Sequence, residues 1–267
     1  RLGDDDHEAR NLINLARANC WRPKASQANA QAFLRLAKAR RRPSDILIGG
    51  SIVGLSLYRA GALAQAKALI GPMAKVGPAS LDRSRTFRFG FDGQISALAN
   101  QALLWWLLGR PDSAARAANA SVVQARHPDQ LVSQFIALAN GAVIAKLSGD
   151  LAAGAGYAAA LRDLVEREAL GFGLRDAQLL GAALLEPAGS PPASLEAMQA
   201  ALIDPGELWV GHLASLYRGW YAERLGRAGR AWEALEEFDA AIAGAEQSDL
   251  WVMPELLRLR GGLLAGA

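Results

Sequence analysis

The sequence is poor in the residues that build disulfides and metal sites. It contains one cysteine, Cys20, among 267 residues, which excludes an intramolecular disulfide and indicates a reducing compartment. We therefore expect a cytoplasmic protein. The three histidines, His7, His127 and His212, lie far apart, and none belongs to a metal-binding spacing such as His-Glu-x-x-His. These absences predict no metal and no cofactor.

Motifs for nucleotide and acyl-transfer chemistry are also missing. No Gly-x-x-x-x-Gly-Lys-Ser/Thr run is present, so the sequence has no phosphate-binding loop of that kind. The run Gly-Gly-Ser-Ile-Val at 49–53 lacks the last glycine of a nucleophile elbow. Cys20 follows an apolar helical face, which is typical of a buried, unreactive thiol. We expect no catalytic residues and no enzyme activity.

The chain has little excess charge and no long apolar run. Its 29 basic and 26 acidic residues give a net charge of +3, which does not favour a protein that coats itself with nucleic acid or anionic lipid. No segment reaches the roughly 18 uninterrupted apolar residues of a membrane helix. Because the chain begins at Arg1 and has acidic residues at 4–6, unlike a signal sequence, we expect it to be a fragment of a larger protein.

What the sequence does have is a glycine repeat. Gly109, Gly149, Gly189 and Gly229 follow one another at intervals of 40 residues, and Gly61 precedes them. A small residue stands five positions after each glycine, and another stands seven positions before it. The later set is Ala66, Ala114, Gly154, Ser194 and Ala234, and the earlier set is Gly54, Ala102, Ala142, Ala182 and Ala222. This spacing favours helical hairpins, with the glycine as a left-handed cap and the small residues where two helices approach closely.

The apolar spacing between these glycines is helical, and no period-two alternation is long enough for a sheet. The predicted helices span about 6–21, 26–40, 45–60, 62–75, 92–108, 111–125, 129–148, 151–169, 174–185, 192–203, 207–226, 229–246 and 250–265. They form six hairpins and a capping helix in one continuous domain over 1–267. Its parts are an atypical hairpin at 1–44, repeats at 45–246 with an inserted loop at 77–92, and the cap at 250–265.

The inserted loop combines cations and aromatic rings. Arg83, Arg85 and Arg88 alternate with Phe87, Phe89 and Phe91, a combination that can bind an anionic or planar partner. The alternative, which we favour, is that the phenylalanines fill a gap between hairpins and Asp92 caps the next helix. The basic run at 38–42, Lys-Ala-Arg-Arg-Arg, is explained by its place at a helix C-terminus.

Most tryptophans and tyrosines are expected in the core between repeats. Trp105, Tyr217, Tyr221 and Trp232 are nevertheless candidates for a concave surface, where a solenoid binds a peptide or a small effector.

The glycine at the turn and the small residue five positions later resemble the tetratricopeptide repeat family over residues 45–246. Three strings extend the resemblance: Phe-Gly-Phe-Asp at 89–92, Trp-Leu-Leu-Gly-Arg-Pro-Asp-Ser-Ala at 106–114, and Pro-Glu-Leu-Leu-Arg-Leu-Arg-Gly at 254–261 after Trp251. These are similar to the C-terminal repeat regions of bacterial STAND-type ATPase regulators with winged-helix or nucleotide-cyclase domains. The resemblance implies a right-handed superhelical solenoid, and upstream ATPase and output domains as partners.

Two functions follow from this resemblance. The first is a regulatory sensor and protein-interaction module of a signalling or transcriptional regulator, with a protein partner or a small effector on the concave face. The alternative is a scaffold that binds a peptide segment without a ligand switch. A sensor predicts a pocket with apolar walls and convergent polar groups, whereas a scaffold predicts an open groove. We expect no direct nucleic-acid binding and no membrane insertion.

Overall fold

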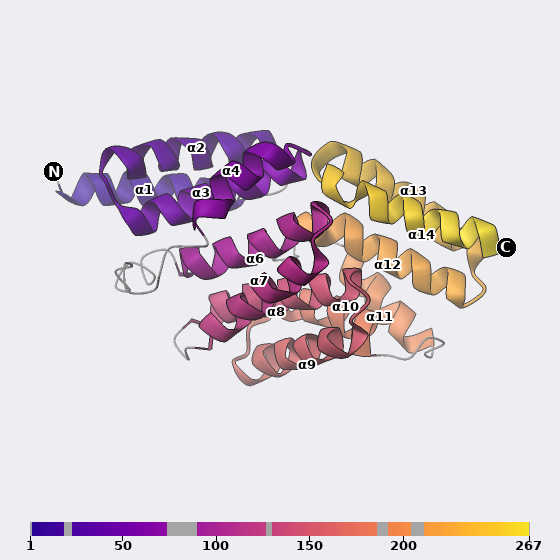
Figure 1. The fold of residues 1–267 in the computed structure, drawn as a ribbon. Coiled ribbons are helices and arrows are strands. Elements are labelled where there is room, and N and C mark those ends of the chain that lie inside the picture. Colours follow the sequence, from indigo (N-terminus) through magenta and orange to yellow (C-terminus); the bar gives the residue numbers. More distant parts are fainter. Residues whose placement is uncertain are drawn as a thin grey trace. The chain divides into compact units, whose positions relative to one another are not determined.

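The protein is all-helical in the part of the chain that the structure describes. This structure is a computed structural model that describes residues 2–18, 23–73, 90–126, 130–185, 192–203 and 211–266. In these ranges it contains thirteen α-helices and three short 3-10 helices, and no strand (Figure 1). The all-α fold class is therefore confirmed.

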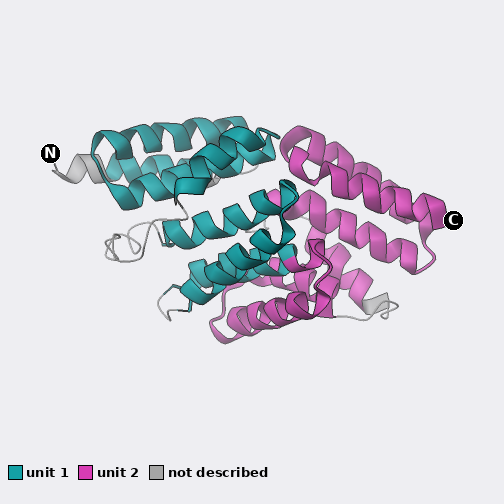
Figure 2. Ribbon diagram, viewed as in Figure 1, with its two compact units in different colours: residues 1–144 teal, residues 145–267 magenta. Residues whose placement is uncertain are grey.

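The chain divides into two compact units, residues 1–144 and 145–267 (Figure 2). Unit 1 holds α1 (Leu2–Ala18), α2 (Pro23–Ala39), α3 (Pro43–Arg59), α4 (Leu63–Met73), α6 (Gly93–Leu107), α7 (Pro111–Gln124) and most of α8 (Leu131–Leu147). Unit 2 holds the end of α8, then α9 (Leu151–Arg167), α10 (Leu174–Leu185), α11 (Pro192–Leu202), α12 (Ala214–Arg227), α13 (Ala231–Ser248) and α14 (Met253–Gly266). The single continuous domain over 1–267 stays a prediction.

Neighbouring helices pack as antiparallel pairs within each unit. In unit 1, α1 packs on α2, α2 on α3 and α3 on α4, and α6 contacts α3, α4 and α7. In unit 2, α10 contacts α9, α11 and α12, while α12, α13 and α14 pack against one another. The helices of these pairs thus bury apolar residues against their neighbours in sequence, and α6 and α12 also contact helices more distant in the chain.

The predicted left-handed glycines end the first helix of a pair. Gly61, Gly109, Gly149 and Gly229 have φ values of 77°, 70°, 77° and 78°. At the first of these turns, the Gly61 N–H donates to the Tyr58 carbonyl and the Ala62 N–H donates to the Leu57 carbonyl, both at 2.9 Å. The same pair of bonds follows Gly109, Gly149 and Gly229, which is the Schellman pattern of helix C-caps. Gly189 lies outside the described residues.

Two other helices end in the same way without glycine. Arg41 after α2 and Ala169 after α9 both have a φ of 51°, and their N–H groups donate to Lys38 and Glu166. A side chain is disfavoured in this conformation, so these two turns carry backbone strain that glycine would relieve. The glycine pattern in the sequence marks turns inside the predicted hairpins and does not mark these two.

The small residues of the repeat lie at helix contacts. A Cβ atom on Gly54 would lie 2.4 Å from Cγ1 of the fully buried Ile70, and one on Gly154 would lie 2.7 Å from Leu184 Cδ2, so a larger residue at either position requires its neighbour to move. The other small residues are almost fully buried: Ala66, Ala102, Ala114, Ala142, Ala182, Ser194, Ala222 and Ala234.

Helix boundaries agree with the predicted ones to within a few residues, with two larger differences. Helix α1 spans Leu2–Ala18, whereas the prediction began it at residue 6. The predicted helix at 207–226 is wrong for 211–213, which form a 3-10 turn before α12. Residues 207–210 lie outside the described part. A further 3-10 turn at Leu250–Val252 precedes α14.

Candidate functional site

The inserted loop is described only at its end. Arg83, Arg85, Phe87, Arg88 and Phe89 lie outside the described residues. Phe91 is 5% exposed and packs in a core cluster with Ala9, Ile13, Phe33 and Ile48. The Asp92 side chain accepts hydrogen bonds from the N–H groups of Gln94 and Ile95 and so caps α6. These two residues hold the loop's end to unit 1, and Phe91 offers no surface for a partner.

Trp105 lies half-buried at the end of α6, between two cations. The Lys67 Nζ atom of α4 lies 5.9 Å from the centroid of the indole ring, and Arg110 Cζ lies 5.3 Å from it. Both distances are within the range of cation–π attraction. The structure therefore already supplies cationic partners to this ring.

Of the other aromatic candidates, two are in the core and one is on the surface. Tyr217 and Tyr221 are 0% and 3% exposed, so both lie in the core, and a binding role for any of the four aromatic candidates stays a prediction. The Tyr217 hydroxyl donates to Asp176 Oδ1 at 3.4 Å, and burial, then the charge of Asp176, raises the pKa of Tyr217 well above its ordinary value. Trp232 is 74% exposed on α13. Helical spacing alone did not distinguish the buried tyrosines from the exposed tryptophan, because α12 is buried on more than one side.

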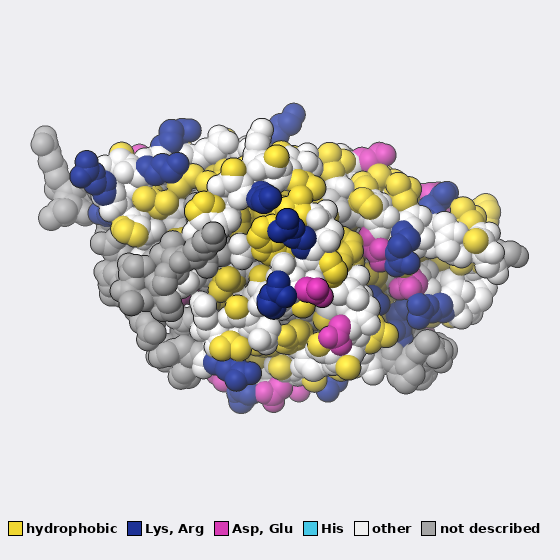
Figure 3. All heavy atoms as spheres, in the orientation of Figure 1, with side chains coloured by type: hydrophobic (Ala, Val, Ile, Leu, Met, Phe, Trp, Pro, Cys, Tyr) yellow, Lys and Arg dark blue, Asp and Glu magenta, His cyan; other side chains and the backbone are white. Residues whose placement is uncertain are grey.

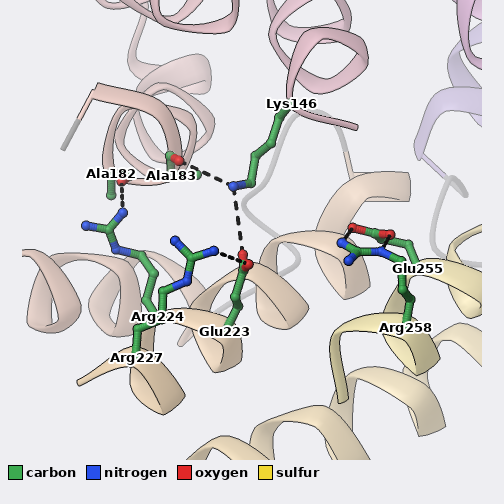
Figure 4. Close-up of polar contacts among 8 residues, drawn as sticks. All are labelled: Lys146, Ala182, Ala183, Glu223, Arg224, Arg227, Glu255 and Arg258. Carbon is green, nitrogen blue, oxygen red and sulfur yellow. Dashed lines mark hydrogen bonds and ion pairs between the residues drawn. The ribbon is translucent and has the colours of Figure 1, made fainter. Parts of the chain in front are cut away.

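A cluster of charged side chains that the sequence did not single out lies inside unit 2 (Figure 4). Lys146, at the end of α8, donates through Nζ to the Ala183 carbonyl at 3.4 Å and lies 3.9 Å from Glu223 Oε2 on α12. Its Nζ atom also lies 5.1 Å from the centroid of the Trp220 ring. Burial lowers the pKa of Lys146, an effect that the charge of Glu223 opposes.

The same cluster caps the C-terminus of α10. Arg224 of α12 donates to the Ala182 carbonyl at 2.7 Å, next to the Ala183 carbonyl that Lys146 reaches (Figure 4). Carbonyls in the last turn of a helix have no partner within the helix, and the helix dipole favours cations there. Lys146 is the only charged residue in the sequence of α8, and that is the one signal from which this contact could have been suspected.

Beside this cluster lies a pocket of about 510 Å³ formed by α12, α13 and α14. Leu263 is half-buried and supplies apolar surface to its lining, and behind it lie Leu259, which is 8% exposed, and Phe238, which is fully buried. Glycines at 226, 229 and 262 leave the space open because they carry no side chain. A volume of this size accommodates a small organic molecule.

Three charged side chains also line the pocket: Glu223, Arg227 and Arg258. Arg227 donates to Glu223 Oε1 at 2.7 Å, and Arg258 forms two bonds to Glu255, at 2.7 and 2.8 Å (Figure 4). The bond to Glu255 is the largest cause that raises the pKa of Arg258. The side chains of Arg227 and Arg258 are 58% and 66% exposed, so both guanidinium groups are accessible to a ligand.

The described residues provide neither a metal-binding group nor a membrane-spanning helix. Among the described residues, no three side chains of His, Cys, Asp and Glu are grouped so that they could hold a metal ion. In the same part of the chain, none of the helices combines the length and the apolar character needed to span a membrane.

Comparisons with protein-family models, with curated proteins and with solved structures find no match to this chain. The resemblance to tetratricopeptide regions of STAND-type regulators therefore stays a prediction.

Proposed function

We propose that this chain is a ligand-binding regulatory module of a larger signalling or transcriptional regulator, built as a right-handed solenoid of about six tetratricopeptide-like hairpins. What supports the architecture is the repetition of one turn. The same left-handed glycine and the same two hydrogen bonds end α3, α6, α8 and α12. The upstream ATPase and output domains belong to this proposal through the family resemblance, and the cytoplasmic location belongs to it through the single cysteine.

The observation that carries the functional part is the pocket of α12, α13 and α14. Apolar walls with a few convergent polar groups are the usual features of a small-molecule site. Leu263 and the exposed edge of Leu259 suit a small apolar part, and Arg227 and Arg258 suit a carboxylate or phosphate group. The ligand class is thus a small molecule with an apolar part and an anionic group.

Glu223 connects the pocket to the interior of unit 2. Its Oε1 accepts from Arg227, which lines the pocket, while its Oε2 faces Lys146. A ligand anion that draws Arg227 away leaves Glu223 to pair with Lys146 alone. Ligand binding therefore shifts the population of side-chain arrangements around the end of α8, and the coupling equals the ligand's difference in affinity between them.

A thermal-shift screen with metabolites that carry an apolar part and an anionic group tests the site. Gly262 lines the pocket, and a Cβ atom there would meet nothing within 4 Å, so Gly262→Leu places an added side chain at the pocket wall with room for its Cβ. Gly261→Leu is the matched control, because its Cβ is equally free and Gly261 is not among the lining residues. Both variants should fold, since leucine favours a helix more than glycine does.

The proposal predicts a ligand that raises the melting temperature of the wild-type chain and of Gly261→Leu but not of Gly262→Leu. A ligand at a hundred times its Kd stabilises the folded state by about 2.7 kcal/mol. A hit that survives Gly262→Leu lies elsewhere and contradicts this pocket. If no compound raises the melting temperature of any form, the sensor proposal fails and the peptide-binding scaffold takes its place.

A further inference from the structure

The net charge of the whole chain is small because its two units carry net charges of opposite sign. Residues 1–144 contain 19 basic and 9 acidic residues, whereas residues 145–267 contain 10 basic and 17 acidic ones. Between Glu8 and Asp82 the sequence has 12 basic residues and a single acidic one, Asp45, which is 1% exposed. The prediction of no nucleic-acid binding was drawn from the whole-chain balance, which averages over this division.

The basic residues of unit 1 are concentrated on one face of α2. From residue 24 to residue 38, the exposed residues of this helix are three cations, one amide and one alanine: Lys24, Ala28, Gln31, Arg35 and Lys38. Their spacing of four, three, four and three places them on a single stripe, opposite the buried Ala30, Phe33 and Ala37. We call these five exposed residues the α2 stripe, and Arg41 continues it into the turn.

The cations of the α2 stripe are not paired with a carboxylate in the described part of the chain. No ion pair or hydrogen bond joins Lys24, Arg35 or Lys38 to any described residue, and α2 contains no Asp or Glu. Two described carboxylates pair with arginines that directly follow α2: Glu8 with Arg40 at 3.4 Å, and Asp45 with Arg42 at 3.8 Å. The side chains of the aspartates at 4–6 lie outside the description.

The two units differ in the arrangement of their charges as well as in their sign. In unit 2, Arg167, Arg227, Arg230 and Arg258 each pair with a glutamate. In the space-filling view, dark blue Lys and Arg side chains gather over α1 and α2, while blue and magenta lie together over α12 and α14 (Figure 3). Unit 1 therefore presents positive charge that its described carboxylates do not compensate.

We propose that the α2 stripe binds the phosphate backbone of double-stranded nucleic acid. The stripe has no aromatic or large apolar side chain, so it lacks the apolar centre that a protein interface needs. Lys, Arg and Gln are among the side chains that contact phosphates, and the small Ala28 leaves the backbone free to approach. From Lys24 to Lys38 the helix rises about 21 Å, and B-DNA carries one charge per about 1.7 Å of its axis. A row of cations along one helix suits a rigid duplex backbone. Such phosphate contacts do not depend on the base sequence.

Fluorescence anisotropy with a labelled DNA duplex of about 20 base pairs at about 50 mM salt tests this proposal. The test variant is K24E/R35E/K38E. The matched control is R162E/R167E/R230E, which makes the same charge change at three exposed arginines of unit 2. Circular dichroism of both variants checks that the helices are retained. This experiment is independent of the pocket variants, so its failure leaves the proposed ligand site standing.

The expected result is binding by the wild-type chain and by the control, and a loss of at least about tenfold in affinity for K24E/R35E/K38E. With three or four phosphates neutralised, log Kobs should fall against log salt with a slope of about −3. Equal loss in the control, or no binding at low salt, overturns the proposal.

Competition experiments separate duplex binding from other partners of the same charge. Duplex DNA and duplex RNA should compete for the stripe better than single strands of equal length. Stronger binding to vesicles that contain phosphatidylserine would assign the stripe to a membrane surface and overturn the proposal. Self-association in sedimentation that K24E/R35E/K38E abolishes would assign it to acidic residues of a second copy and would also overturn it.

Discussion

Lys146 shows how a single residue joins packing to electrostatics. Burial lowers its pKa, Glu223 opposes that effect, and Arg227 and Arg224 add to it. Between the lowered pKa and the ordinary value of about 10.4, the unfolded chain binds more protons than the folded one. The free energy of unfolding therefore rises with pH in that window, and the full cost of burying the charge is present below it.

Replacing Lys146 with methionine should remove this pH dependence. At pH 7 the methionine variant does not bury a charge, so it should have a higher free energy of unfolding than the wild-type chain. The gain corresponds to about 1.4 kcal/mol for each pKa unit by which the folded state lowers the pKa of Lys146. As the pH rises toward 10, the wild-type chain gains stability relative to K146M. Urea denaturation from pH 7 to pH 10 measures the difference, with exposed Lys24→Met as the control. Parallel stability curves for wild type and K146M would refute the expectation.

At the scale of elements, the packing of α12 against α14 depends on two glycines seven residues apart. A Cβ atom on Gly219 would lie 2.3 Å from Leu256 Cδ2, and one on Gly226 would lie 2.6 Å from Leu263 Cδ1. Leu256 is 0% exposed, whereas Leu263 is half-buried and borders the pocket. The two contacts look alike in sequence spacing, but only Leu263 has open space into which it can rotate.

Alanine should therefore have different effects at these glycines. Gly219→Ala forces a buried leucine out of place and should lower the free energy of unfolding by about 1–3 kcal/mol. Gly226→Ala should be close to neutral, because Leu263 can move and alanine favours a helix by about 1 kcal/mol over glycine. Midpoints of urea denaturation measure both. A larger loss at Gly226 than at Gly219 would show that this account of the packing is mistaken.

At the scale of the whole molecule, α14 closes one side of unit 2. Trp251, Val252, Leu256 and Leu259 are buried there, and the helix contacts both α12 and α13. Stacked helical pairs need such a cap, because an uncovered pair exposes its apolar face to water. The pocket also depends on this helix, since Arg258, Leu259, Gly262 and Leu263 form part of its lining.

Deleting residues 250–267 should therefore destabilise unit 2 and remove the ligand site together. The loss should reach several kcal/mol, because a fully buried apolar side chain contributes about 1.5–3 kcal/mol. Urea denaturation measures the loss of stability, and calorimetric titration of the shortened chain with a ligand found in the thermal-shift screen measures the loss of the site. An unchanged midpoint would mean that the contacts of α14 contribute little.

Local sequence determined most of the helices and four of the turns. Helical periodicity and the left-handed conformation of glycine act within a few residues, so the sequence was enough to place α10 at 174–185 and the turn at Gly109. The same reasoning placed breaks after residues 40 and 169 but did not reveal the left-handed conformation of Arg41 and Ala169, because these residues adopt it without a glycine to signal it.

The candidate site was decided by the tertiary structure. Lys146 meets Ala183 across 37 residues and Arg224 meets Ala182 across 42, so helical period alone could not bring them together. The exposure of the aromatic side chains also depends on tertiary packing, because Tyr217 is enclosed by contacts between helices whereas Trp232 is not. The sequence by itself determined where most helices begin, turn and end, since those preferences are local. Which faces became core, pocket or charged surface depended on packing between distant segments.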